Sequence, residues 1–201
     1  MRRFSCLLLV LSACAHAPQT GNAGESARPT TATGAPAATT TTGTPAATTT
    51  SFPVETIAPR AEDVSSIDGM VRAYYEVVDV APDAPRQWAR DRTLFSPWIR
   101  FVAIGDRIRV MDHQQLVDNS EPLVRKGLHE REIFRTVRRY GDIAHVDSTY
   151  ELRVGPEGKL SRGVNSLELY FDGKRWWITS AIWQAETPQH PIPPELLPRA
   201  R

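Results

Sequence analysis

The chain has 201 residues, with 24 basic and 23 acidic side chains and a formal net charge of +1. This near balance excludes the strongly basic surface that proteins use to bind nucleic acids or other polyanions. Hydrophobic residues make up 41% of the chain, which is enough for one buried core.

The first residues have the pattern of an export signal. Residues 1–13 contain two arginines and a short apolar run, and Cys14 follows. The run is about half the roughly 20 residues that a membrane-spanning helix needs, so it predicts a cleaved signal. Leu11-Ser12-Ala13-Cys14 resembles the lipobox of bacterial lipoproteins. The resemblance implies cleavage before Cys14, acylation of that residue and, because Ala15 rather than Asp follows, an outer-membrane protein facing the periplasm. An ordinary secretory signal is the alternative.

The cysteine count limits the chemistry of the mature protein. The two cysteines are Cys6, which leaves with the signal, and Cys14, which carries the lipid. The folded part therefore has no thiol. This excludes a disulfide framework, a thiolate zinc site and a cysteine nucleophile.

Residues 14–60 are predicted to be a disordered tether that starts at the lipidated cysteine. Thr, Ala, Pro and Gly dominate, and no charged residue occurs between Arg28 and Glu55. So little apolar surface cannot offset the conformational entropy lost on ordering. A flexible chain of this length spans on the order of 40 Å, which lifts a domain clear of a bilayer surface.

Residues 61–187 have a globular composition, and the first part of this region is predicted to be helical. A helix is expected from Ser65 or Ser66 to about 79, a short helix at 86–91, a strand at 99–104 and a longer helix at 112–124. The first helix has one apolar stripe, formed by Val64, Ile67, Val71, Tyr74, Tyr75 and Val78.

Four consecutive strands follow, and their turns define a meander. We expect strands at 128–139, 143–154, 159–171 and 174–186, and Asp172-Gly173 is a strong hairpin signal. Helices followed by antiparallel strands predict an α+β domain. Its antiparallel sheet, a four-strand meander plus a short strand, packs on the N-terminal helices. Residues 188–201 are a proline-rich tail.

The turn lengths set a register that places one polar row among apolar residues on the inner face of the sheet. This row consists of Arg135, Ser148, Asn165 and Ser180. Tyr150 and either Tyr74 or Tyr75 are positioned to join it. One interpretation is the polar floor of a ligand pocket. The alternative is an internal hydrogen-bonded network that binds nothing.

The outer face of the predicted sheet carries aromatic residues among charged ones. Phe134, Trp177 and Trp183 lie there in the predicted register. Aromatic side chains are typical of interface cores, so they predict a homodimer contact. The alternative is that the proline-rich tail covers this face with Ile192, Leu196 and Leu197.

The order helix, strand, helix and long meander resembles the nuclear transport factor 2-like superfamily, in its branch with polyketide cyclases and ketosteroid isomerases. Residues 132–151 and 162–186 are the most specific part of this resemblance. It implies a curved sheet that wraps over helices to form a cone-shaped cavity, and dimerisation through the outer face.

The resemblance also implies where catalytic groups would lie, because catalytic members place a carboxylate or a His–Asp pair inside the cone. The predicted register points His145 and Asp147 outward and leaves only His129 on the inner face, near its rim. No metal-binding, nucleotide-binding or nucleophile motif occurs, so neither a metal nor a cofactor is predicted.

Two functions are compatible with this pattern. The first is a membrane-anchored, exported domain that binds a small apolar ligand or a partner without catalysis. The second is an isomerase, dehydratase or cyclase acting on a small apolar substrate in the cone. A carboxylate with a raised pKa inside the cone would favour the enzyme.

The lipobox interpretation predicts that Cys14→Ser releases the protein from membranes. Acyl chains contribute about 0.8 kcal/mol per buried methylene group, and more than one chain makes attachment stable. Fractionation of cells that express each form measures the effect. A variant that stays in the membrane pellet as wild type does would show that another anchor operates.

Overall fold

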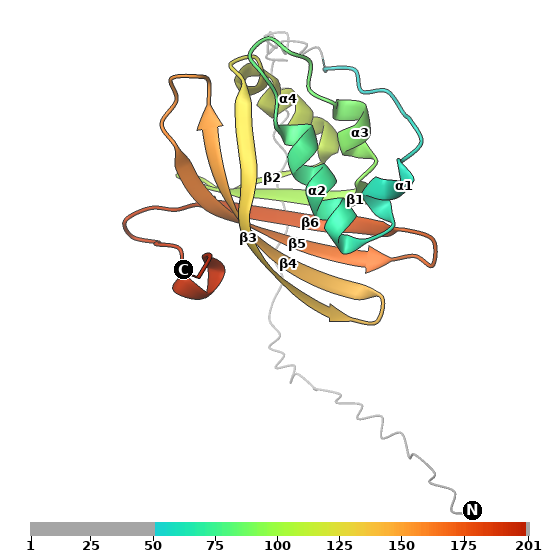
Figure 1. The fold of residues 1–201 in the computed structure, drawn as a ribbon. Coiled ribbons are helices and arrows are strands. Elements are labelled where there is room, and N and C mark those ends of the chain that lie inside the picture. Colours follow the sequence, from blue (N-terminus) through green and yellow to red (C-terminus); the bar gives the residue numbers. More distant parts are fainter. Residues whose placement is uncertain (1–50, 200–201) are drawn as a thin grey trace, which may run out of the picture. The chain divides into compact units, whose positions relative to one another are not determined.

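A computed structural model of the chain describes residues 51–199 (Figure 1). The predicted signal, Cys14 and most of the predicted tether lie outside these residues. The described elements, in chain order, are α1 (Ala61–Val64), α2 (Ile67–Val78), α3 (Trp88–Arg92), β1 (Phe95–Ile104), β2 (Arg109–Met111), α4 (His113–Val124), β3 (Leu128–Tyr140), β4 (Ile143–Val154), β5 (Ser161–Phe171), β6 (Trp176–Ala185) and a 3-10 turn (Pro194–Leu196).

The strands form one six-stranded sheet in the order β2-β1-β6-β5-β4-β3. The curved sheet packs on helices, so the predicted α+β class and cone are confirmed. The sheet is mixed, however, because β1 runs parallel to β6 while all other neighbours are antiparallel. Local turn signals predict hairpin partners. The β1–β6 pair joins segments far apart in the sequence, so no turn signal predicts it.

The two longer helices form close to the predicted bounds, and each begins at a residue that caps it. The Ser66 side chain accepts a hydrogen bond from the Gly69 amide at 3.0 Å and begins α2. Asp112 and Gln115 form a reciprocal capping box at the start of α4. Within residues 51–199, no helix is long and apolar enough to cross a bilayer.

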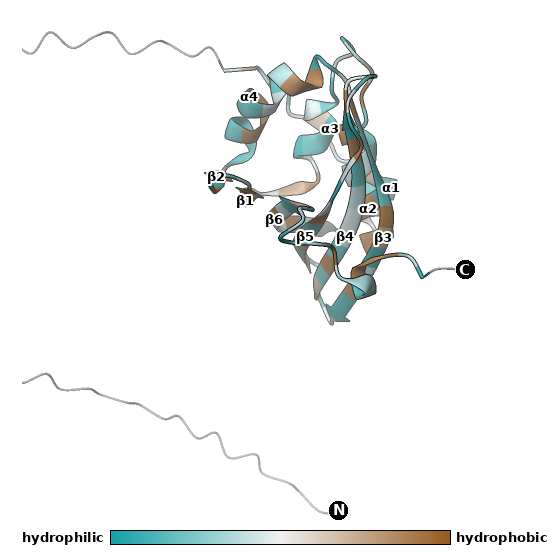
Figure 2. Cartoon of the chain, turned by 90° about the vertical axis from the view of Figure 1, so that its left-hand side faces the viewer, coloured by the Kyte–Doolittle hydropathy of each residue, from teal (hydrophilic) through white to brown (hydrophobic). Residues whose placement is uncertain are grey.

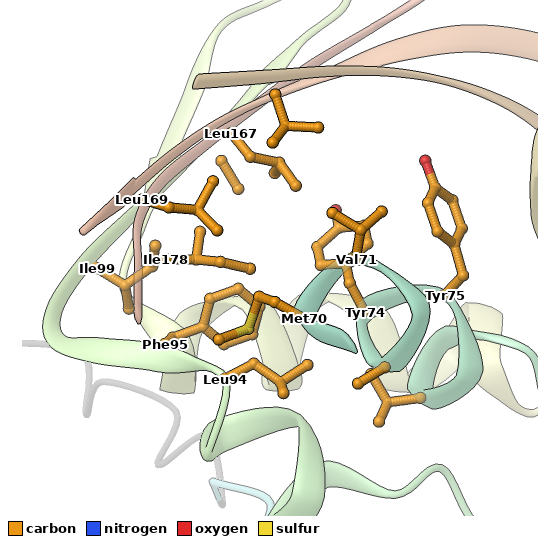
Figure 3. Close-up of a cluster of buried hydrophobic side chains, with 14 of the residues drawn as sticks. Met70, Val71, Tyr74, Tyr75, Leu94, Phe95, Ile99, Leu167, Leu169 and Ile178 are labelled. Carbon is orange, nitrogen blue, oxygen red and sulfur yellow. The ribbon is translucent and has the colours of Figure 1, made fainter. Parts of the chain in front are cut away.

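The core lies between α2 and the inner face of the sheet. Met70 and Val71 of α2 pack in one cluster with Leu167 of β5 and Ile178 of β6, and all four are fully buried (Figure 3). Burying such a side chain contributes about 1.5–3 kcal/mol. The alternation that places one set of residues inward is visible as brown and teal segments along the strands in Figure 2.

A β-bulge in β3 changes which residues point into the cone. The predicted pairs hold from Tyr140 opposite Ile143 down to Arg135 opposite Ser148. Ile133 is then an extra residue, so Glu132 rather than Ile133 lies opposite Tyr150.

All residues of β3 before this bulge therefore lie on the opposite face from the one predicted. Glu130 and Glu132 point inward. The predicted inward position of His129 is wrong, because its ring is half exposed and contacts Asp79 at 2.9 Å.

A second bulge changes the register of β6. Thr179 is the extra residue, since Leu169 pairs with Ile178 but Glu168 pairs with Ser180. The predicted place of Ser180 in the inner polar row is wrong, and it lies on the outer face. The predicted outer position of Trp183 is also wrong, because Trp183 lies opposite Asn165 on the inner face. The hairpin turn signal fixes only the start of the register, and the bulge changes the rest.

The C-terminal tail covers part of the outer face. The Thr149 hydroxyl donates to the Leu196 carbonyl, and the Ile192 amide donates to Glu186 Oε1 at 3.1 Å. Ile192 is buried, and in the view of Figure 2 the tail lies in front of the sheet. Phe134 of β3 pairs with Thr149 of β4, so the tail lies where one of the predicted dimer contacts was placed.

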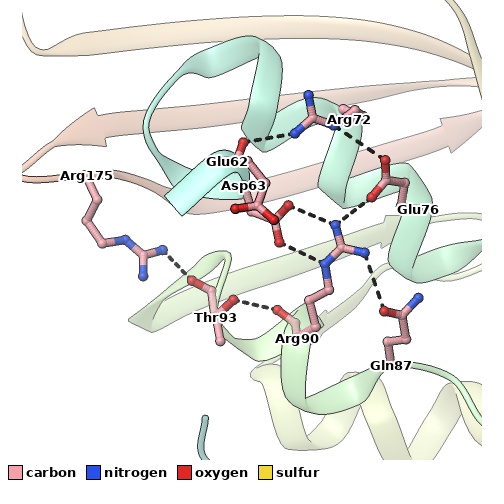
Figure 4. A network of polar contacts seen from close by, with 8 residues as sticks. All are labelled: Glu62, Asp63, Arg72, Glu76, Gln87, Arg90, Thr93 and Arg175. Carbon is pink, nitrogen blue, oxygen red and sulfur yellow. Dashed lines mark hydrogen bonds and ion pairs between the residues drawn. The ribbon is translucent and has the colours of Figure 1, made fainter. Parts of the chain in front are cut away.

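A buried ion pair joins the small helices to α2. The Arg90 guanidinium donates two hydrogen bonds of 2.8 Å to the Asp63 carboxylate and a further one to Glu76 (Figure 4). Asp63 is fully buried. The hydrogen bonds from Arg90 hold the pKa of Asp63 below its ordinary value.

We predict that Arg90→Met lowers the free energy of unfolding by about 3–5 kcal/mol, because it leaves the Asp63 carboxylate buried without a partner. Arg72→Met is the matched control. Its side chain is 51% exposed against 8% for Arg90, and an exposed pair with Glu76 contributes about 0–1 kcal/mol. Denaturant titration measures both, and equal losses would contradict the buried role of Arg90.

Candidate functional site: a carboxylate inside the cone

The helices and the inner face of the sheet enclose a cavity of about 170 Å³. Residues of α2, α3, α4 and strands β1 and β3 to β6 line it, and most of them are apolar. Trp183 is part of this lining, as its corrected register requires. The polar or ionisable side chains that line the cavity include Tyr74, Arg86, Asp91, Glu130, Tyr150 and Asn165.

Glu130 is a carboxylate on the inner face that the β3 bulge turns toward this cavity. Burial raises the pKa of Glu130 to about 7, and the Asn165 amide at 3.2 Å and the charge of Arg86 act in the opposite direction. At neutral pH both protonation states are populated. Such a group can accept a proton and return it, which is what general acid–base catalysis needs.

A chain of hydrogen bonds leads from this carboxylate across the sheet. Asn165 Nδ2 donates to Glu130 and, at 3.1 Å, to the Tyr75 hydroxyl. The Tyr75 and Ser148 hydroxyls are 2.7 Å apart, and Ser148 donates to Glu132. Since Ser148 gives its proton to Glu132, Tyr75 donates to Ser148. All the bonds from Asn165 to Glu132 therefore point the same way, which polarises each donor in turn.

The rim of this network is charged. Arg135 contacts Glu132 at 3.1 Å and Asp68 of α2 at 3.1 Å. These ion pairs tie β3 to the start of α2. The Arg135 side chain is thus at the edge of the sheet's inner face, outside the lining of the cavity.

The opposite wall holds a second carboxylate in a different state. Asp91 Oδ1 accepts from Arg86 at 2.9 Å, and Asp91 Oδ2 is 2.7 Å from His113 Nε2. Although burial opposes its ionisation, Arg86 and His113 together hold the pKa of Asp91 below its ordinary value. The Arg86 guanidinium also lies 4.0 Å from the ring centre of Trp88. Asp91 is thus ionised at neutral pH and paired within the protein, while Glu130 titrates near neutrality.

Three of the six predicted ligand-binding residues line the cavity, namely Tyr74, Tyr150 and Asn165. The other three do not. Ser148 is fully buried behind Tyr75, Arg135 is at the rim, and Ser180 is on the outer face.

Sequence reasoning missed Glu130, Tyr75 as the bridging phenol, and the Arg86–Asp91 pair. One signal for Glu130 exists in the sequence. Ile133 and Phe134 are two consecutive apolar residues in a mostly polar strand, and an extra bulged residue lets both be accommodated without exposing one of the two to the wrong face.

Tyr150 reaches the cavity because the neighbouring strand has a glycine. A Cβ atom at Gly163 would collide with the Tyr150 hydroxyl and with the Gln184 carbonyl. Gly163 pairs directly with Tyr150, so its missing side chain gives the phenol ring room to lie across β5. Within residues 51–199, no group of His, Cys, Asp and Glu is arranged to hold a metal ion.

Comparison with known proteins gives the class of the fold. No protein-family model and no curated protein matches the chain. Among solved structures, a candidate dehydratase of the NTF2-like family from Streptomyces avermitilis is 14% identical, with a TM-score of 0.50 over 62% of this chain and 96% of that one. An uncharacterised Caulobacter vibrioides protein with a cystatin-like fold is 14% identical, with a TM-score of 0.50 over 62% and 90%.

A third structure, an NTF2-like protein of unknown function from Silicibacter pomeroyi, is 14% identical, with a TM-score of 0.46 over 61% and 94%. The similarity to the Streptomyces avermitilis structure shows that the chain has a nuclear transport factor 2-like fold, as its resemblance to that superfamily implied. Identities this low show the fold alone and assign no activity.

The state of Glu130 makes stability depend on pH. In the folded protein Glu130 holds its proton up to a pKa of about 7, against an ordinary value of 4.5. Between these values the unfolded chain releases the proton and the folded chain keeps it. The stabilisation from this group is therefore complete below pH 4.5 and is lost as pH rises through 7.

We predict that the free energy of unfolding of wild type falls by on the order of 2 kcal/mol relative to Glu130→Gln between pH 4.5 and 8. Denaturant titrations at several pH values measure this difference. Glu157→Gln, in an exposed turn, serves as the control and should track wild type. Parallel pH curves for wild type and Glu130→Gln would contradict the raised pKa.

Proposed function

We propose that the cone is an acid–base site in which Glu130 moves a proton within a small, mostly apolar substrate. The reaction is an isomerisation or a dehydration next to a carbonyl group. The single observation that carries this proposal is a carboxylate that lines an apolar cavity and has a pKa of about 7. A carboxylate with that pKa is ionised often enough at neutral pH to act as a base, and basic enough to hold the proton it takes.

The residues around Glu130 support this chemistry. Ionised Glu130 takes a proton from the carbon next to the carbonyl, and negative charge develops on the carbonyl oxygen. Burial raises the pKa of both Tyr74 and Tyr150, so their hydroxyls stay protonated and can donate to that oxygen. Glu130 then returns the proton to a different carbon, or a hydroxyl on the neighbouring carbon takes it and leaves as water. Asn165 orients the Glu130 carboxylate through its 3.2 Å hydrogen bond.

Binding without catalysis is the second candidate, and the lining of the cavity favours it. A mostly apolar surface with a few convergent polar groups suits a small-molecule site whether or not a reaction follows. The volume of about 170 Å³ is below the roughly 300–1,000 Å³ of common ligand sites, so a ligand or substrate in the cone must be small.

The proposed setting is the cell envelope, with the domain attached through acylated Cys14 and facing the periplasm. The lipobox-like residues 11–14 support this setting. A homodimer through the outer face stays a prediction, and its candidate residues are now fewer. Trp177 remains on the outer side of β6, whereas Trp183 lies in the cone and Phe134 lies where the tail packs.

The proposal predicts turnover that depends on Glu130. The purified chain is incubated in D₂O with small β,γ-unsaturated ketones and β-hydroxy ketones, and NMR follows isomerisation, water loss and deuterium uptake. Glu130→Gln should lower the rate by about 10²–10⁴-fold, while Glu157→Gln should leave it unchanged. The wild-type rate should rise with pH to a plateau above about 7. Ligand-induced thermal stabilisation without turnover would support binding instead, and an unchanged rate in Glu130→Gln would refute the role of Glu130.

A further inference from the structure

A second, larger cavity lies outside the cone. Its volume is about 430 Å³, within the range of small-molecule sites. Its walls are residues 56–59, one side of α3, the first residues of β1 and the start of β6. Residues 52–54 are held beside it, because Gln114 donates to the Phe52 carbonyl at 2.8 Å and Arg92 donates to the Val54 carbonyl at 3.1 Å.

The lining of this cavity is apolar apart from a few groups. Phe95, Ile99 and Trp177 supply large apolar surfaces, and Ile57 and Pro59 close one side. Two arginines, Arg92 and Arg175, also line it, and no carboxylate does. The cavity thus combines an apolar interior with positive charge.

These two arginines bind only neutral acceptors. Arg92 donates to Val54 O, to Gln114 Oε1 at 3.1 Å and to His113 Nδ1 at 3.5 Å. Arg175 donates to the Thr93 carbonyl (Figure 4) and also to the Trp176 carbonyl at 3.1 Å. Within residues 51–199, neither guanidinium takes part in an ion pair.

The nearest carboxylate to Arg175 is already engaged elsewhere. Asp172, on the exposed hairpin turn, accepts hydrogen bonds from the backbone amides of Lys174 and Arg175 and from the Trp177 indole. The Arg175 guanidinium instead lies 3.6 Å from the ring centre of Trp177. Burial lowers the pKa of Arg175, as expected for a cation that has lost water without gaining a full counter-charge.

The cavity lining also contains a polar side chain without a partner. Ser96 is 1% exposed, and its Oγ atom has no hydrogen bond within the described part of the chain. A buried hydroxyl left unpaired destabilises the fold because it has lost its hydrogen bonds to water. A rotation of this side chain toward the cavity would let a polar ligand group satisfy it.

We propose that this cavity binds an amphipathic monocarboxylate, whose carboxylate contacts Arg175 or Arg92 and whose apolar chain or ring fills the space along Phe95, Ile99 and Trp177. A neutral apolar molecule would leave the two guanidinium groups without a counter-charge. A small polyanion such as phosphate would leave the apolar walls unfilled. The site stands apart from the acid–base proposal, since Glu130 is absent from its lining.

Calorimetry on the full purified chain with decanoate, decanol and inorganic phosphate tests the site. Decanoate should bind at least tenfold more tightly than decanol, which has the same chain but no charge, and phosphate should not bind. Arg175→Gln should weaken decanoate at least tenfold and leave decanol unchanged, while Arg175→Lys should retain part of the preference.

Two further variants locate the binding. Ala89→Trp places a large side chain in the cavity from α3 and should abolish binding of both chain molecules. Glu130→Gln, in the cone, should not change decanoate binding, which separates this proposal from the acid–base one. Absence of decanoate binding, equal binding of decanoate and decanol, or full decanoate affinity in Ala89→Trp would each overturn the proposal. If Arg175→Gln does not fold, the comparison of decanoate with decanol in wild type and Ala89→Trp decides alone.

Discussion

The candidate site depends on one extra residue in β3. Ile133 interrupts the pairing of β3 with β4, so the β3 residues before it have their side chains on the opposite faces from those a regular strand would give. Without this bulge Glu130 and Glu132 would point to solvent, and the basic residues beside them would face the core. With it, one carboxylate meets Asn165 and the other meets Ser148. A bulge leaves one residue without a partner in the hydrogen-bond ladder and bends the strand. Bulges are nevertheless common beside active sites, where they change the direction in which side chains point.

The cone places two carboxylates in opposite states by giving them different partners. Asp91 has a guanidinium and an imidazole within hydrogen-bonding distance, so it stays ionised in spite of burial. Glu130 has only a neutral amide, so burial dominates and its pKa rises. Environment rather than residue type decides which carboxylate can exchange protons near neutral pH. Because Asp91 is already paired with Arg86 and His113, it also competes poorly with Glu130 for a proton of the substrate.

Sequence patterns predicted helices α2, α3 and α4, the four strands of the meander and the pairing of β4 with β5, because apolar periodicity, turns and alternation are local signals. The pair Ser148 and Asn165 followed from them. The sheet faces on which Glu130, Ser180 and Trp183 lie were not predicted. Each of these residues is separated by a bulge from the turn that sets its register, and one extra residue moves every side chain beyond it to the opposite face. The β1–β6 pairing and the Asp63–Arg90 ion pair were not predicted from the sequence either. Both join distant segments, and nothing in the neighbouring sequence marks the partner.

The two cavities share one structural support, the five-residue helix α3. Three successive side chains of α3 take different roles: Arg90 pairs with buried Asp63, Asp91 forms part of the cone wall, and Arg92 lines the second cavity. A helix this short is not stable by itself, so its position must come from these contacts. The Asp63–Arg90 pair is one of the two buried ion pairs among them. A change that weakens it should therefore disturb Asp91 and Arg92 together, and hence both cavities, before it disturbs the meander on the far side of the core.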